Sequence, residues 1–183
     1  MEIPLVEIEI ALPKRPLRGT IVALRTWEPD DSEWYVAARD EVIFQWTTEP
    51  RGLTADAVRH TIEAQLRRPR FAGFAITDLK TKELLGNISL VFSEPDCHQA
   101  EIMYWLSPAA RGRGAATDAV RIAIGWAFDA SPIDQIELLT SPGNEASQRV
   151  ARRAGFTPSG NRGNQLVFRA TRQSWKQGSP LTH

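Results

Sequence analysis

Alternation of apolar and polar residues predicts the strands of this chain. The alternating segments lie at residues 19–27, 71–92, 100–108, 133–142 and 164–175. The second segment holds two strand patterns around a polar, charged turn, which predicts a hairpin. Within residues 100–108 a period of two separates the side chains onto two faces, with Ile102, Tyr104 and Leu106 opposite Glu101, Met103 and Trp105.

Apolar residues at helical spacing predict helices between these strands. The helices are expected at residues 28–44, 53–68, 114–128 and 144–156. Acidic residues open the first helix, where Asp31 or Ser32 is a possible N-cap, and Thr54 is the candidate cap of the second. Residues 5–12 also alternate and predict an extra edge strand or an ordered lead-in that ends before Pro13.

The order of these elements predicts an α/β chain with a mixed sheet. At 183 residues the chain is expected to form one domain over residues 1–175. Residues 1–18 would be the lead-in or edge strand, and residues 176–183 a flexible tail.

Composition narrows the partners that this domain can have. Lysine plus arginine and aspartate plus glutamate number 22 each, so no broad surface for nucleic acid or for a membrane is expected, and any anion site must be local. The single cysteine and three scattered histidines give no metal-ligand spacing, so no metal is expected. The first residues do not resemble a secretory signal, and no apolar run approaches the length that spans a membrane, which favours a cytoplasmic protein.

The segment RGRGAATDAV at residues 111–120 is a candidate anion site. A strand, a glycine-rich turn and a helix N-terminus leave backbone N–H groups free for a phosphate, and Arg111 and Arg113 add charge. The spacing of a P-loop is absent. A dinucleotide fingerprint would use Gly112 and Gly114 but meets Thr117 where a small residue is needed. A plain strand-to-helix connection is the alternative that involves no ligand.

The pattern R-x-x-G-x-A, formed by Arg111, Gly114 and Ala116, resembles the pyrophosphate loop of the GNAT superfamily of N-acetyltransferases. The phrase W-L-x-P at residues 105–108 and N-x-x-S-x-x-V at residues 144–150 are most similar to the branch that acetylates the N-terminal serine or alanine of ribosomal proteins. The resemblance extends from about Thr20 to Trp175.

This resemblance implies a fold and a cosubstrate. The fold is a mixed, mostly antiparallel sheet of six to seven strands with helices on both faces, splayed between strands 4 and 5. The cosubstrate is acetyl-CoA, with its pantetheine arm along the strand and its pyrophosphate on the loop amides. The residues that would hold it are Tyr104, Trp105, Leu106, Arg111, Gly112, Arg113, Gly114, Ala115, Ala116, Thr117 and Asn144. A plain N-cap is the alternative role of Asn144.

The resemblance also suggests catalytic residues. Glu101 is the first candidate for the base and Glu137 the second, although a solvent-facing strand glutamate is an equal alternative for each. In many relatives a tyrosine acts as the general acid at the position where this chain has Ala151. Ser147 matches the serine of the ribosomal-protein branch. Ser147 could instead only cap its helix. The backbone N–H of Leu106 is the candidate donor to the oxyanion.

The expected function is therefore transfer of acetyl from acetyl-CoA to a primary amine, either a protein N-terminus or a small molecule. The protein would act as a monomer or homodimer. Two alternatives remain at this stage: a non-catalytic acyl-CoA-binding module and, more distantly, a dinucleotide-binding protein.

Overall fold

A single mixed sheet forms the centre of the protein. The computed structural model describes residues 10–65, 68–93 and 98–178, and within them eight strands pair in the order β1-β2-β3-β4-β5-β6-β8-β7. Only β5 and β6 run parallel, and every other neighbouring pair is antiparallel. The strands are β1 (Leu17–Arg18), β2 (Val22–Thr26), β3 (Phe71–Asp78), β4 (Leu84–Phe92), β5 (Gln99–Leu106), β6 (Gln135–Thr140), β7 (Thr157–Arg162) and β8 (Gln165–Thr171).

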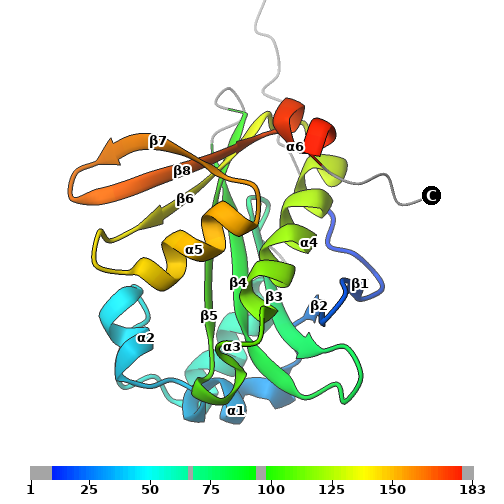
Figure 1. The fold of residues 1–183 in the computed structure, drawn as a ribbon. Helices are drawn as coiled ribbons and strands as arrows, with labels where there is room; N and C mark the ends of the chain where they lie inside the picture. Colours follow the sequence, from blue (N-terminus) through cyan, green and yellow to red (C-terminus); the bar gives the residue numbers. More distant parts are fainter. Residues whose placement is uncertain (1–9, 66–67, 94–97, 179–183) are drawn as a thin grey trace, which may run out of the picture.

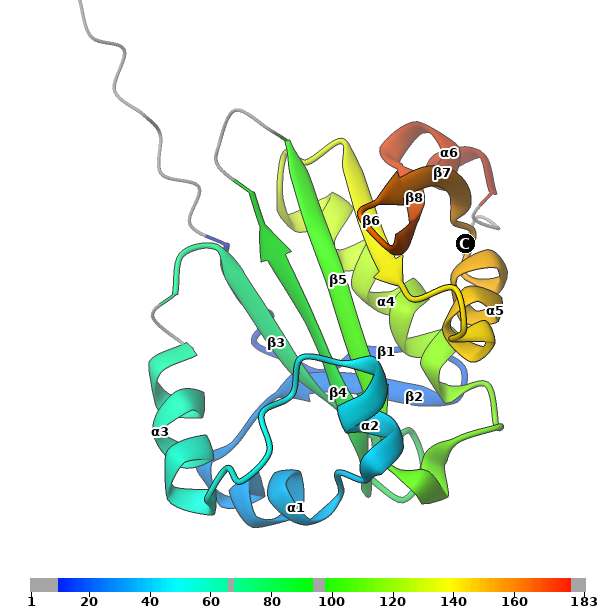
Figure 2. The same ribbon diagram turned by 90° about the vertical axis from the view of Figure 1, so that its left-hand side faces the viewer.

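Helices cover both faces of this sheet, as expected (Figure 1 and Figure 2). The helix α4 packs its buried side on one face, next to α5, while α1 and α3 pack around Trp27 and Ala75 on the other. The helices are α1 (Ser32–Ala37), α2 (Glu41–Trp46), α3 (Ala55–Gln65), α4 (Ala115–Ala130), α5 (Glu145–Arg153) and α6 (Arg172–Gly178). Two 3-10 turns, Pro29–Asp31 and Pro108–Ala110, precede α1 and follow β5.

The parallel pair β5 and β6 separates part-way along its length. Its register pairs are Gln99 with Gln135, Ala100 with Ile136, and Glu101 with Glu137, and none follows. Both strands continue with their outer neighbours, so β5 stays paired to β4 as far as Leu106. The two strands therefore diverge as a V, which confirms the expected splay; strands 4 and 5 of that expectation are β5 and β6 here.

The helix expected at residues 28–44 is divided in two, and that prediction was wrong. Residues after Ala37 leave the helix, and Asp40 adopts an extended conformation in which its side chain accepts from the N–H of Ile43. A second N-cap inside the segment starts α2 in a new direction. The expected cap of α3 is confirmed, because the N–H of Ala57 donates to Thr54.

The C-terminal part also differs from the prediction. We expected one strand at residues 164–175, but a hairpin of β7 and β8 ends at Thr171 and α6 follows. Hydrogen bonds between Thr171 and Ser174 turn the chain into this helix, which includes residues 176–178 of the expected tail. With β7 and the two-residue β1, the sheet exceeds the six to seven strands expected. The alternation that suggested an edge strand lies mostly in residues 1–9, outside the described residues.

Asp118 in the first turn of α4 ties the helix to the start of β2. Its carboxylate accepts from the backbone N–H groups of Thr20, Ile21 and Val22, at 3.2, 2.7 and 2.9 Å. Burial pushes the pKa of Asp118 upward, but these donors outweigh it and hold the pKa below its usual range. The N-terminus of α4 is thus fixed to the sheet at the place where the glycine loop enters it.

Candidate active site

A large cleft lies where β5 and β6 diverge. It has a volume of about 740 Å³ and is lined by residues from both strands, from α2 and α3 on one side of the sheet and from α5 on the other. Most of the sequence-predicted residues meet here: Glu101, Tyr104, Trp105, Leu106, Arg111, Gly112, Ala116, Asn144 and Ser147. The V thus brings the two halves of the predicted site into one space.

The edge of β5 that faces the V carries backbone groups with no strand beside them. Because the N–H of Ser107 donates to Leu85 of β4, alternation along the strand directs the N–H of Leu106 away from β4, toward the V. An extended ligand rich in amides can pair with such an edge as an added strand does. The pantetheine arm of acetyl-CoA has this chemistry.

The glycine loop forms the N-terminus of α4 at one end of the cleft. Gly114 is the N-cap residue, with φ of +82°, and Gly112 has φ of +77°. A Cβ added at Gly112 would meet no atom within 4 Å, so its backbone borders open space. Ala115 and Ala116 are buried against the core, while Arg113 is exposed. The amides of the first turn, up to Thr117, fit a pyrophosphate by their unpaired donors and the helix dipole.

The side chain of Arg111 is already engaged within the protein. Its guanidinium forms two hydrogen bonds with Asp40, at 2.7 and 2.8 Å, and donates to the carbonyl of Leu106 at 3.0 and 3.2 Å. The Arg111 guanidinium lowers the pKa of the Asp40 carboxyl below its usual range. Arg111 therefore connects β5, the loop and α2, and its charge is not free for a phosphate in this arrangement.

Asn144 and Ser147 lie on α5, on the opposite wall of the V. The Asn144 side chain accepts from the N–H of Ser147 at 3.1 Å, so the capping role that we kept open is present. The hydroxyl of Tyr104 reaches across from β5 to Ser147, with 3.3 Å between the oxygens. Sequence reasoning assigned Tyr104 only to the wall of the cofactor channel, and the meeting of these two hydroxyls is a tertiary contact that the motif does not encode.

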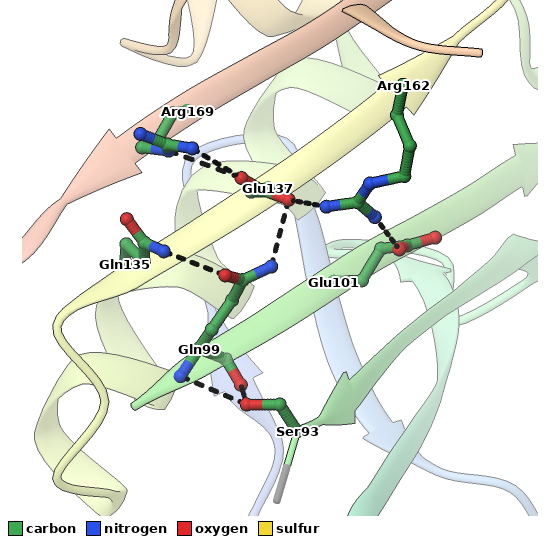
Figure 3. Close-up of polar contacts among 7 residues, drawn as sticks. All are labelled: Ser93, Gln99, Glu101, Gln135, Glu137, Arg162 and Arg169. Atoms are coloured by element: carbon green, nitrogen blue, oxygen red, sulfur yellow. Dashed lines mark hydrogen bonds and ion pairs between the residues drawn. The ribbon is translucent and has the colours of Figure 1, made fainter. Parts of the chain in front are cut away.

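The two candidate bases have different surroundings (Figure 3). The Glu137 side chain is 3% exposed, and its two oxygens accept from Arg169 at 2.8 and 3.3 Å, from Gln99 at 2.9 Å and from Arg162. Every acceptor site of this carboxylate is occupied. Glu101 keeps 35% of its side chain exposed and borders the cleft, and one of its oxygens accepts from Arg162 at 3.2 Å.

This contrast separates the candidates. A general base must reach the proton that it takes and must have a free lone pair. Glu137 has neither a position on the cleft nor an unoccupied acceptor, so the structure argues against it as the base. Glu101 lines the cleft, and one of its oxygens has no hydrogen-bond partner among the described residues.

A third carboxylate, Glu49, borders the cleft and was missed from the sequence. It lies after α2, and one oxygen accepts from the Tyr35 hydroxyl at 2.7 Å and the Trp105 indole at 3.1 Å, while the other accepts from Arg39 at 3.2 Å. Trp34 stacks on Trp105 with ring centroids 6.1 Å apart. Glu49 thus holds the side chains of Tyr35 and Trp105, which line the cleft beside α1. In the sequence, the aromatic residues at 27–46 indicate such a cluster, but Glu49, the carboxylate that binds them, lies after that run.

A dinucleotide-binding fold needs a mostly parallel sheet, whereas this sheet has one parallel pair, β5 with β6, among the described strands; the fold therefore argues against the dinucleotide-binding alternative. Among known proteins, the family described as the acetyltransferase (GNAT) domain matches residues 22–157. The chain belongs to the GNAT acetyltransferase family. Its open, mostly antiparallel sheet is consistent with the fold of that family.

Individual proteins that are similar to this chain also carry names of acetyltransferases. YdaF of Bacillus subtilis (strain 168), a protein named for ribosomal N-acetyltransferase activity, is 30% identical over 146 residues, which is 76% of this chain and 79% of YdaF. The structure of the ribosomal-protein acetyltransferase RimL in complex with coenzyme A superimposes with a TM-score of 0.75 at 18% identity, covering 86% of this chain and 98% of RimL. Mycobacterium smegmatis RimJ gives 0.72 at 21% identity over 87% of each chain.

No helix among residues 10–65, 68–93 and 98–178 is long and apolar enough to cross a membrane. In the same part of the chain no three histidine, cysteine or acidic side chains gather as a metal site.

Proposed function

We propose that this protein transfers the acetyl group of acetyl-CoA to a primary amine by direct attack, and that the amine is the N-terminal amine of a protein. The observation that carries the proposal is the V between β5 and β6, which joins an unpaired strand edge, a helix N-terminus and the carboxylate of Glu101 in one cleft. The names of YdaF and RimL support a ribosomal-protein acceptor.

Acetyl-CoA supplies an activated acetyl thioester. Its binding residues in this proposal are the backbone groups of Tyr104, Trp105 and Leu106 for the arm, and the amides from Gly112 to Thr117 for the pyrophosphate. The N–H of Leu106 points into the V and is the proposed donor to the oxyanion.

The amine must lose a proton to react. An α-amino group has a pKa of about 8, so much of it is protonated at neutral pH. In our proposal Glu101 takes that proton, directly or through one water, and becomes a neutral carboxylic acid. The nitrogen lone pair then attacks the acetyl carbon. As the carbon–sulfur bond breaks, the extra proton left on the nitrogen passes to the departing sulfur, so the products are the amide and the free thiol of CoA. Ser147 donates a hydrogen bond to the departing sulfur.

The first test is binding of acetyl-CoA, measured by calorimetric titration. The wild-type protein is expected to bind with saturation at micromolar concentrations, and Gly114→Asp to bind roughly tenfold more weakly or worse, since it places a negative charge at the helix N-terminus. Gly52→Asp is the matched control, because Gly52 also has positive φ, at +75°, and open space around it. Equal affinity in the wild-type protein and Gly114→Asp would remove the cofactor assignment.

The second test is release of free thiol from acetyl-CoA. Peptides that begin with serine or alanine are compared with small primary amines, and the proposal expects saturable thiol release with a peptide. If only a small amine produces thiol, the acetyltransferase activity is supported and the proposal of a protein acceptor is rejected. If acetyl-CoA binds but no amine in the panel produces thiol, the non-catalytic acyl-CoA-binding module becomes the better description, and the absence of a tyrosine hydroxyl at Ala151 would fit it.

A further inference from the structure

The hairpin of β7 and β8 sends one arginine back over the sheet, to the apex of the V. Arg162, the last residue of β7, contacts Glu101 of β5 and Glu137 of β6 with the two ends of its guanidinium (Figure 3). We propose that Arg162 is a positioning residue for the reaction, which fixes the Glu101 carboxylate in the orientation that receives the proton of the acceptor amine. This inference rests on the proposed function.

The local structure of β7 explains how Arg162 reaches this place. The register of β7 on β8 shifts between Pro158 and Asn161, and Gly160 within the shift has φ of +104°, which favours glycine. A bulge bends its strand and increases the twist. The bend brings the end of β7 closer to β6. The Arg162 side chain can therefore reach across β8 to Glu137, although β7 lies two strands away from β6 in the sheet.

Glu137 serves as the anchor of this arrangement. It is buried and held by Arg169 and Gln99, and the Gln99 side chain is held in turn by Gln135 at 2.7 Å. A fully hydrogen-bonded buried network is rigid, because moving one member leaves the others unpaired. The guanidinium of Arg162 is planar, so an arginine fixed at one end by Glu137 presents its other end at a fixed position.

Glu101 is the partner of Arg162 that borders the cleft. Its Oε2 accepts from the Nη1 of Arg162, and among the described residues Oε1 has no hydrogen-bond partner. One oxygen is therefore held and the other stays free beside the cleft. A base whose rotamer is set before the substrate binds needs no reorganisation during proton transfer. This explains why a half-exposed glutamate on an open strand can serve as a base.

The experiment compares Arg162→Gln with Arg169→Gln in the full chain, with acetyl-CoA and the best acceptor from the thiol-release panel. Both variants remove one arginine from Glu137, but only Arg162 touches Glu101. Arg162→Gln is expected to lower kcat about tenfold or more and to leave the KM for acetyl-CoA unchanged. Arg169→Gln keeps the contact between Arg162 and Glu101, so it should lower kcat less than Arg162→Gln does, and Arg162→Lys should recover part of the rate.

Glu101→Gln separates this inference from the proposed function. If Glu101→Gln loses activity while Arg162→Gln keeps the wild-type kcat, the positioning role is refuted and the base assignment stands. If Glu101→Gln is fully active, both the role of Glu101 as the base and the positioning role of Arg162 are refuted. In the double variant Arg162→Gln/Glu101→Gln we expect no loss beyond that of Glu101→Gln, because both changes remove one interaction. Additive losses would contradict the positioning role.

Discussion

The hydroxyl of Tyr104 shows how one residue can act on the chemistry of another. Its oxygen lies 3.3 Å from that of Ser147, and burial raises the pKa of Tyr104 to about 12. The phenol therefore stays protonated at physiological pH. A phenol is a better donor than an alkyl alcohol, so Tyr104 donates and leaves the proton of Ser147 free to point into the cleft. In the proposed reaction that proton meets the departing sulfur.

At this scale we predict the effect of Tyr104→Phe. The change removes one oxygen and keeps the ring packing, so kcat should fall about three- to tenfold while the KM for acetyl-CoA stays the same. Ser147→Ala should lower kcat at least as much, and the double variant should be no slower than Ser147→Ala, because both changes disable one donor. Steady-state kinetics with thiol detection measures all three. A normal kcat in Tyr104→Phe would show that Ser147 is oriented in another way.

At the scale of elements, the close contact of β4 and β5 holds one arm of the V. Gly86 of β4 lies opposite Leu106 of β5, and a Cβ at Gly86 would come within 2.2 Å of the carbonyl oxygen of Trp105. That neighbour is backbone and cannot turn aside as a side chain could. The β4 residue therefore has to be glycine for β5 to keep its position at the cleft.

Gly86→Ala is accordingly expected to lower the free energy of unfolding by about 2 kcal/mol or more and to weaken acetyl-CoA binding, because β5 must shift. Gly112→Ala is its control: an added Cβ there meets no atom, so only the strain of positive φ remains, about 1 kcal/mol. Chemical denaturation measures both. If Gly86→Ala lowers the free energy of unfolding less than Gly112→Ala does, β4 can shift at little cost and the close contact with Trp105 does not require glycine.

Elements were predictable from the sequence where one local signal dominates. The alternation in β5, the hairpin of β3 and β4, and the N-caps at Thr54 and Asn144 are all read from neighbouring residues. The division of α1 from α2 depends on the cap at Asp40, whose carboxylate is held by an arginine 71 positions away. Periodicity within one segment does not contain such a partner.

At the scale of the whole molecule, the V and the loop were predicted from the sequence through the family resemblance. The hydrogen bonds and ion pairs of charged side chains that connect distant segments were not predicted. Glu49, Arg162 and Asp118 each act through residues distant in the chain, so no motif in their own segment marks them. The candidate base illustrates the difference. Glu101 and Glu137 are both strand glutamates in the sequence, and the structure distinguishes them by burial, by position on the cleft and by their contacts with Arg162 and Arg169.

The pair of Arg111 and Asp40 joins the glycine loop to α2, which lines the cleft on the side of the sheet opposite α5. In our proposal the loop binds acetyl-CoA, and the α2 side of the cleft is the acceptor pocket. Because Arg111 also holds the Leu106 carbonyl, Asp40→Asn should disturb both substrates, raising the KM for acetyl-CoA and for the acceptor about three- to tenfold with a small change in kcat. The pKa of Asp40 lies below its usual range, so the pair is complete above the unfolded value of about 3.9 and is lost as the pH falls through the lower folded value.

The difference in thermal stability between the wild-type protein and Asp40→Asn should therefore be constant from pH 5 to pH 8. Arg51→Gln is the matched control, because Arg51 forms a similar two-bond pair with Glu41 on the exposed side of the same helix, where it touches neither β5 nor the loop. That variant should leave both KM values unchanged. If Asp40→Asn alters the KM of the acceptor alone, α2 is coupled to the acceptor pocket and the link through Leu106 to the cofactor is absent.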